Sequence, residues 1–202
     1  MLLGAMNNPH MDLIKEVKWI IKRFDFLDLT LEMPKGFPEN VRDLKEAIGN
    51  TPVVGHTGWY LPIGAPLKEM RLYAVQEFER CLGIFEKLGV DKVNIHLENW
   101  DGYDENSLVD ANVWTLRKLV TLAHGYGVEV MAENTGGVFS RPDMLIKVFE
   151  KVPRLKLHLD IGHANIGFKN NQSPSILRYL SKKLVHVHIS DNDGRGDEHQ
   201  AI

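Results

Sequence analysis

Residues 184–199 read LVHVHISDNDGRGDEH, and the alternation at the start of this stretch decides how the chain folds. Aliphatic and polar residues take turns along it, with Val185, Val187 and Ile189 set against His186, His188 and Ser190. Successive side chains of a β-strand point to opposite faces, so both histidines lie on one face. The glycine-rich loop that follows carries carboxylates and a third histidine, namely Asp191, Asp193, Asp197 and His199. Such side chains suit a divalent metal. The alternative is a surface loop with incidental histidines. A metal site is favoured only if other strands carry matching ligands to the same place.

Six further segments have the character of short strands, and amphipathic helices separate them. The predicted strands are Leu2–Met6, Phe26–Glu32, Pro52–His56, Lys92–Glu98, Val128–Glu133 and Leu155–Asp160, with Leu184–Ser190 as the seventh. The first predicted helix has Asn8 as its N-cap and Pro9 at its first position. The later helices are predicted at Val41–Ile48, Leu67–Leu88, Ser107–His124, Arg141–Lys151 and from Ser173 onward.

Regular alternation of strands and helices indicates a parallel sheet, either doubly wound or closed as a (β/α)8 barrel. The strands of an open parallel sheet read as continuous apolar runs, because helices cover both faces. These strands have one aliphatic and one polar face, which favours an α/β fold of the (β/α)8 TIM-barrel type. We predict a single domain over residues 1–202.

The barrel is predicted to lack its eighth strand. Seven strands fit into 202 residues, whereas a complete barrel takes about 250. The domain is therefore expected to be C-terminally incomplete, either shortened or closed by another chain. Unpaired strand edges and uncovered core at the gap predict a homodimer or poor stability.

The composition argues against a nucleic-acid-binding, disulfide-stabilised or membrane-spanning protein. The formal charge of -3 offers no basic surplus for nucleic acid. The one cysteine, Cys81, excludes an internal disulfide and is expected to be a buried apolar group. No uncharged apolar run approaches membrane-spanning length, and the chain opens as a strand rather than a signal peptide. We therefore expect a cytoplasmic protein without a membrane partner.

Polar side chains collect where the predicted strands end, which is where a (β/α)8 barrel carries its catalytic groups. Eight of them form the candidate site: His56, His96, Glu133, Asp160 and His188 at strand ends, and His163, Asp197 and His199 in the adjacent loops. Carboxylates that converge on a lumen repel one another, and a cation is the usual remedy. We predict that all eight are metal ligands. His158 and His186 share the lumen face one layer deeper, where a supporting or packing role is expected.

The motifs that carry these residues resemble the xylose isomerase-like barrel superfamily. Its most specific parts here are AENTGG around Glu133, HLDIGH with Asp160 and His163, and HISDNDGRGDEH with His188, Asp197 and His199. VGHTGWYLPIG around His56 and VNIHLEN around His96 are looser. The superfamily includes sugar and sugar-phosphate isomerases and epimerases, and the endonuclease IV type of apurinic endonuclease. In the isomerase branch the metal takes a Glu, an Asp, a His and a final Glu, and the resemblance assigns the first three to Glu133, Asp160 and His188.

The resemblance implies an enzyme of carbohydrate metabolism that acts on a small sugar or sugar phosphate. We expect a metal-dependent isomerase or epimerase, with Mn, Zn, Mg or Co as the divalent metal. It would transfer a proton through a metal-stabilised enediolate, with Glu133 and His163 as catalytic residues. The endonuclease branch adds ligands where His56, His96, His163, Asp197 and His199 fall, so a zinc phosphodiesterase for abasic DNA is the alternative. Strand-end loops without a Lys/Arg surplus argue against nucleic acid. A truncated, catalytically silent barrel is the second alternative.

Overall fold

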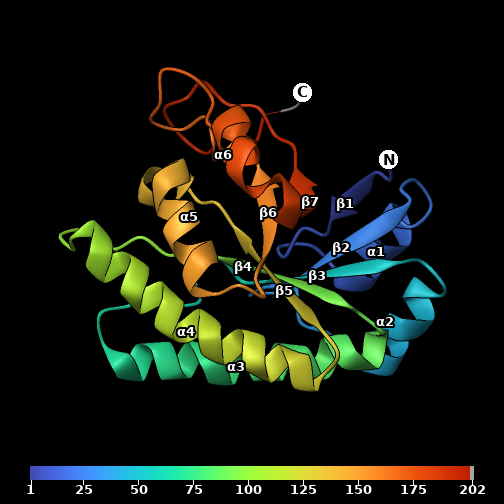
Figure 1. Ribbon diagram of the computed structural model, residues 1–202. Coiled ribbons are helices and arrows are strands. Elements are labelled where there is room, and N and C mark those ends of the chain that lie inside the picture. Colours follow the sequence, from blue (N-terminus) through green and yellow to red (C-terminus); the bar gives the residue numbers. More distant parts are fainter. Residues whose placement is uncertain (201–202) are drawn as a thin grey trace.

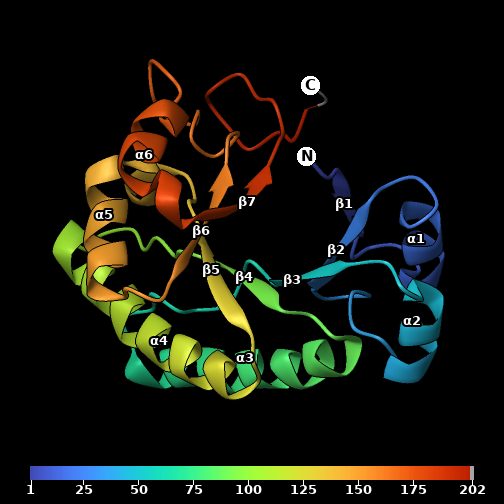
Figure 2. The same ribbon diagram turned by 45° about the vertical axis from the view of Figure 1, so that its right-hand side comes forward.

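A computed structural model describes residues 1–200; residues 201–202, the end of the predicted domain, lie outside the described part. Its strands are β1 (Gly4–Met6), β2 (Phe26–Leu31), β3 (Val53–Thr57), β4 (Lys92–His96), β5 (Glu129–Glu133), β6 (Lys156–Asp160) and β7 (Leu184–His188). All neighbours pair in parallel, in the order of the sequence from β1 to β7. The sheet curls around its polar face (Figures 1 and 2). The predicted α/β barrel type is confirmed, and within residues 1–200 it has seven strands and no eighth.

The α-helices lie outside the curled sheet and cover its aliphatic face (Figure 1). They are α1 (Leu13–Ile20), α2 (Val41–Ile48), α3 (Lys68–Leu88), α4 (Glu105–Gly125), α5 (Pro142–Lys151) and α6 (Ser173–Leu180). Short 3-10 turns at Gly137–Ser140 and Ser181–Lys183 precede α5 and β7. Among the described residues, no helix combines the length and the apolar character that crossing a membrane requires.

The core lies between the helices and the outward face of the strands. Leu27, Leu29 and Leu31 of β2 are all buried on that face, as the alternation predicts. Helix α3 contributes Phe78 and Phe85, which are fully buried. At Gly55 in β3 an added Cβ would lie 3.0 Å from the Phe85 ring, so glycine lets α3 approach the sheet closely. The polar residues of the strands are left to line the lumen.

One predicted helix start is wrong. Asn8 and Pro9 do not begin α1, because the Asn8 side chain accepts a hydrogen bond from the His10 N–H and forms a local turn. The N-cap is Asp12, whose carboxylate accepts from the Lys15 N–H at 2.9 Å. At its C-terminal end, helix α3 stops at Gly89, whose φ of 76° lies in the left-handed region.

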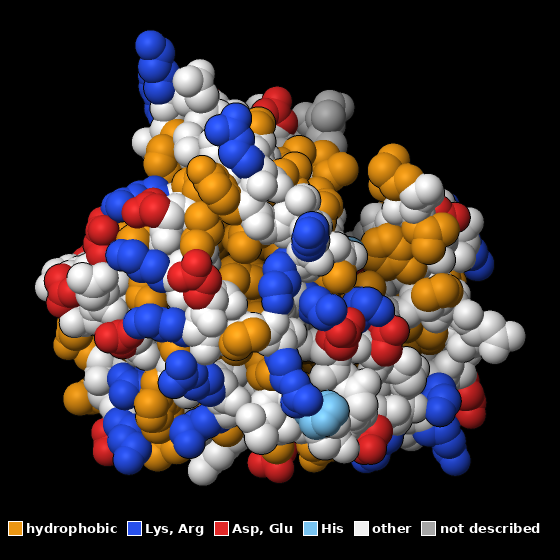
Figure 3. Space-filling view, in the orientation of Figure 1, with side chains coloured by type: hydrophobic (Ala, Val, Ile, Leu, Met, Phe, Trp, Pro, Cys, Tyr) orange, Lys and Arg blue, Asp and Glu red, His pale blue; other side chains and the backbone are white. Residues whose placement is uncertain are grey.

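The two ends of the sheet are exposed on their apolar sides. The outward side chains at the end of the chain, Val185, Val187 and Ile189, are 38%, 38% and 50% exposed. Leu2 and Leu3 before β1 are exposed as well. Figure 3 shows a hollow at the upper edge of this face with hydrophobic side chains on both sides of it. Both edges of the sheet therefore present apolar surface.

Candidate metal centre

Five of the eight predicted residues lie in the last two positions of five successive strands. They are His56 in β3, His96 in β4, Glu133 in β5, Asp160 in β6 and His188 in β7. Parallel register brings them to one rim of the sheet: His96 pairs with Glu133, and Asp160 pairs with His188. The first and last of these residues, His56 and His188, are 132 positions apart in the sequence. The fold brings all five together at the carboxyl ends of the strands, where barrel enzymes carry out chemistry.

Glu133 lies at the centre of this rim and is 1% exposed. Its Oε2 atom lies 3.5 Å from His56 Nε2 and 3.3 Å from His96 Nε2. His158 Nδ1 lies 3.4 Å from the same oxygen, and the Asn94 amide donates a hydrogen bond to it. Three imidazole nitrogens and one amide therefore surround a single carboxylate oxygen.

The other Glu133 oxygen faces the second half of the rim. Oε1 lies 3.2 Å from His163 Nδ1 and 3.7 Å from His188 Nδ1. Both of these nitrogens also lie 3.7 Å from Asp160 Oδ2. The Asp160 carboxylate is held by the His163 backbone N–H, which donates to Oδ1 at 2.7 Å. Two carboxylates and two imidazoles thus face one small volume.

Asp197 and His199 form the outer part of the cluster. Asp197 Oδ2 lies 3.2 Å from His163 Nε2 and 3.0 Å from His199 Nε2. The two side chains are 41% and 59% exposed, so this pair lies at the solvent edge. His163 contacts Glu133 through Nδ1 and Asp197 through Nε2, and it joins the inner and outer parts. All eight predicted residues are therefore connected.

His158 and His186 are register partners two residues before the rim pair of Asp160 and His188, one layer deeper as predicted. Donor atoms of His158, His186 and His188 lie within 4.8 Å of one another. Neither His158 nitrogen has a hydrogen-bond partner in residues 1–200, although the side chain is fully buried. A packing role alone leaves two buried polar atoms unpaired, which is costly.

Asp28 and Asn134 are the polar residues that sequence reasoning missed. Asp28 Oδ2 accepts hydrogen bonds from His186 Nε2 at 2.9 Å and from His188 Nε2 at 3.0 Å. The Asn134 side chain bridges to the Asp160 backbone in both directions, at 2.8 Å each. Alternation in β2 places Asp28 on the lumen face, and that signal was available in the sequence. Contact across the lumen depends on the curvature of the sheet.

Two of the three buried carboxylates, those of Asp28 and Glu133, have their pKa lowered by the imidazoles that surround them. Burial alone would raise the pKa of Asp28, but hydrogen bonds from His186 and His188 outweigh it and hold the pKa well below its usual range. Burial is likewise outweighed at Glu133, where neighbouring imidazoles, His96 foremost, keep the pKa well below normal. At Asp160 burial prevails and raises the pKa, and the nearby Glu133 charge adds to it.

The histidines divide into two groups by their pKa. Burial lowers the pKa of His96 to about 4, so its imidazole is neutral. Burial also lowers the pKa of His163, but the hydrogen bond to Glu133 and the charge of Asp160 outweigh it and raise the pKa to about 9. His188 is raised well above its usual pKa, since burial is outweighed by Asp28 and Glu133. Without a metal ion, protons on His163 and His188 supply the positive charge that the carboxylates require.

The residues present fit a divalent metal. Within residues 1–200, His56 Nε2, His96 Nδ1 and Asp28 Oδ1 are buried without a hydrogen-bond partner, as are both nitrogens of His158. Three further groups of three donors lie within 4.8 Å: His56, Glu133 and His188; Glu133, Asp160 and His163; and His163, Asp197 and His199. Imidazole and carboxylate donors at such spacing suit zinc and similar ions. A cation at the rim would satisfy lone pairs that the protein leaves unpaired.

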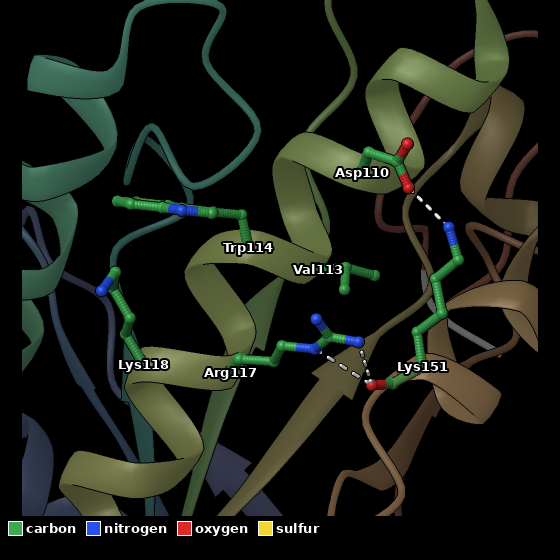
Figure 4. Close-up of a pocket in the computed structure, with 6 residues that line it drawn as sticks. All are labelled: Asp110, Val113, Trp114, Arg117, Lys118 and Lys151. Atoms are coloured by element: carbon green, nitrogen blue, oxygen red, sulfur yellow. Dashed lines mark hydrogen bonds and ion pairs between the residues drawn. The ribbon is translucent and has the colours of Figure 1, made fainter.

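A pocket of about 450 Å³ on the outer surface is not part of this centre (Figure 4). It lies along α4 and is lined by Asp110, Val113, Trp114, Arg117, Lys118 and Lys151. Its cations already have partners, because Lys151 pairs with Asp110 and Arg117 donates to the Lys151 carbonyl at 3.2 and 3.3 Å. Lys118 lies over the Trp114 ring. None of the eight predicted residues lines it, and its contacts join α4 to α5.

Comparison with known proteins identifies related sequences. The family model described as "Xylose isomerase-like TIM barrel" matches residues 22–202. An uncharacterized protein of Methanocaldococcus jannaschii is 33% identical over 104 residues, which are 50% of this chain and 39% of that protein. The match thus spans about two fifths of the relative's length.

Solved structures share the fold over almost the whole chain. A D-tagatose 3-epimerase-like protein superimposes with a TM-score of 0.84 at 23% identity, covering 98% of this chain and 79% of that one. A D-psicose 3-epimerase of Clostridium cellulolyticum H10, solved with D-tagatose, has a TM-score of 0.78 at 17% identity, covering 94% and 73%. At these identities the likeness establishes the fold.

Proposed function

This chain belongs to the xylose isomerase-like TIM barrel family, and from that membership we propose a divalent-metal-dependent isomerase or epimerase of sugars or sugar phosphates. The observation that carries the proposal is the position of Glu133. It is a fully buried carboxylate with Asp160 on one neighbouring strand, His96 on the other, and His188 one strand further. The sugar epimerases of the same fold support the choice of substrate class.

The proposed ligands for the inner cation are Glu133, Asp160 and His188, and His188 Nδ1 lies 3.7 Å from both Glu133 Oε1 and Asp160 Oδ2. His163, Asp197 and His199 would hold an ion at the solvent edge, and His56 and His96 complete the set on the other side of Glu133. A bound cation would supply Lewis-acid stabilisation of the negative charge that develops on substrate oxygens as a proton leaves carbon.

Glu133 and His163 are the proposed proton-transfer residues. Glu133 is ionised, so it can accept a proton or orient the group that does. His163, with its pKa raised to about 9 in the metal-free protein, carries a proton at neutral pH when it holds no cation, and in that state it can return one to the substrate. Their side chains lie 3.2 Å apart, so after one turnover the proton that Glu133 has accepted can pass to His163 and restore both groups.

A groove beside the rim offers room for a sugar ring. Its volume is about 510 Å³, and Tyr60, Tyr73, Trp100 and Glu98 are among the residues that line it. Glu98 and Trp100 follow the predicted ligand His96 by two and four residues. Aromatic faces pack against the C–H faces of a sugar, and carboxylates accept hydrogen bonds from its hydroxyls. We propose that the substrate extends from the metal centre toward this groove.

The test is exchange of substrate protons with solvent. Chelator-stripped protein is loaded in turn with Mn²⁺, Zn²⁺, Mg²⁺ or Co²⁺ and incubated in deuterated water with pentoses, hexoses and their phosphates. Proton NMR should show loss of the signal at the carbon next to the carbonyl for at least one sugar. Glu133→Gln, treated in parallel, should show none. If no combination of metal and sugar exchanges, the proposal is wrong.

The number of donors favours one further candidate, a zinc phosphodiesterase acting on abasic DNA. His56, His96, His163, Asp197 and His199 exceed what a single ion needs. About three zinc ions per chain, together with incision of an abasic duplex, would support it. One or two ions and no incision would leave the isomerase as the proposed function.

A further inference from the structure

Asp28 forms a hydrogen-bonded link between two strands that are not neighbours. It lies in β2, and its side chain is 3% exposed. Its Oδ2 atom accepts from His186 Nε2 at 2.9 Å and from His188 Nε2 at 3.0 Å, both in β7. The strand order runs from β1 to β7, so these bonds cross the lumen near the two ends of the sheet.

The position of Asp28 determines which nitrogen of each imidazole faces it. A carboxylate only accepts, so Nε2 of His186 and Nε2 of His188 must both be donors. The other nitrogen of His188, Nδ1, then faces away from Asp28. It lies 3.7 Å from Glu133 Oε1 and 3.7 Å from Asp160 Oδ2. Asp28 thereby directs one specified atom of His188 at the centre of the proposed metal site.

Packing leaves the His188 ring little freedom to turn away. It stacks on His56 with ring centres 5.5 Å apart and an angle of 17°. His158 meets it edge-on at 4.0 Å. Asp28 holds the ring from behind, and the two neighbours hold it from the sides. An imidazole that is fixed in this way meets a cation with little loss of conformational freedom.

The backbone alone does not secure β7. In the described residues its ladder partner is β6, and its outward side chains are partly exposed. The register between β6 and β7 also shifts between Leu157 and His158. An edge strand paired on one side can fray or slip. The two bonds to Asp28 are side-chain contacts between β7 and β2, and the Phe26 ring of β2 adds an edge-on contact with the His186 ring at 5.6 Å.

We propose that Asp28 is a positioning residue that orients His188 Nδ1 toward the metal centre and ties β7 to β2 across the lumen. The part about the metal rests on the proposed function, whereas the orientation of the ring and the tie do not.

The experiment compares Asp28→Asn with two other variants. His186→Gln removes the second imidazole but keeps the bond between Asp28 and His188. Asp91→Asn removes an exposed carboxylate before β4, at the far end of the strands. The probe is Zn²⁺, titrated into chelator-stripped protein against a chromophoric chelator. We expect Asp28→Asn to weaken zinc binding about 10- to 100-fold, His186→Gln to weaken it less, and Asp91→Asn to leave it unchanged.

A second readout needs no metal. Long-range ¹H–¹⁵N NMR of the stripped protein, recorded at a pH above the pKa of His188 so that the imidazole is neutral, reports which His188 nitrogen carries hydrogen, and this pattern should change in Asp28→Asn. Wild-type zinc affinity and an unchanged imidazole pattern in folded Asp28→Asn would overturn the proposal. If the wild type binds no zinc, the proposed function fails, and the NMR pattern alone decides the role of Asp28.

Asp28→Glu covers the case in which the amide variant does not fold. It keeps the charge but moves the carboxylate by one methylene. Loss of zinc affinity and an altered His188 pattern in Asp28→Glu support positioning. Wild-type values for both would show that only the charge matters, which would contradict it.

Discussion

His96 and Glu133 are register partners on neighbouring parallel strands, and His96 Nε2 lies 3.3 Å from Glu133 Oε2. Their contact does not depend on a loop, because both residues occupy paired positions at the ends of β4 and β5. Sites built on strands are more rigid than sites built on loops. The inner part of the metal centre is therefore preorganised by backbone pairing, whereas Asp197 and His199 lie in the loop after β7.

Replacing Glu133 by glutamine should abolish high-affinity metal binding. Glu133 contacts both halves of the rim, and its amide substitute has one weaker acceptor and no charge. We expect zinc affinity to fall more than about 100-fold. Zinc at 100 times the wild-type Kd should stabilise the wild type by about 2.7 kcal/mol, and the variant by less than about 0.4 kcal/mol, in thermal melts. Glu129→Gln, on the same strand but exposed, is the control. Equal zinc stabilisation of both variants would exclude Glu133 as a ligand.

The outer pair should hold its own cation. Asp197→Asn combined with His199→Gln removes two of the three donors in that group and leaves Glu133, Asp160 and His188 in place. We expect the zinc content, measured by inductively coupled plasma mass spectrometry, to fall by one ion per chain. His124→Gln, an exposed histidine outside the lumen, should change nothing. An unchanged count in the double variant would show that the outer pair binds no ion.

The exposed face of β7 should promote self-association. Val185 and Val187 are both 38% exposed at an edge of the sheet, where apolar surface and unpaired strand attract a partner. Sedimentation velocity should show a weight-average mass that rises with protein concentration. Val187→Lys should reduce that rise. Leu72→Lys, at a residue of α3 that is 39% exposed, serves as the matched control. A concentration-independent monomer would contradict this prediction.

Cys81 should be inert in the folded protein. It is a buried residue of α3, and burial raises the pKa of its thiol to about 12. The thiolate is the reactive form, so at pH 8 little of it is present. Ellman's reagent should label the native chain at least about 100-fold more slowly than the chain in guanidinium, given the thiolate fraction and the lack of access. Rapid labelling of the native protein would show that α3 opens.

Much of the site could be predicted from two-residue periodicity. In β6 the alternation of Leu157 and Leu159 with His158 and Asp160 gives both the buried face and the lumen face. Parallel strands then carry their last polar residues to a common rim. The contact of Asp28 with β7 could not be predicted in this way, because it depends on how far the sheet curls. The predicted start of α1 was wrong for a local reason, because Asn8 forms a turn and Asp12 provides the N-cap.

The link from Asp28 to β7 also bears on how the chain folds. It joins residues that are 158 and 160 positions apart, so it closes very long loops. Contacts of such high order form after local pairing has aligned the intervening strands. They are therefore expected to be absent from the folding transition state. Loss of this link should leave the refolding rate almost unchanged and accelerate unfolding. Asp28 would then contribute to the kinetic stability of the native state.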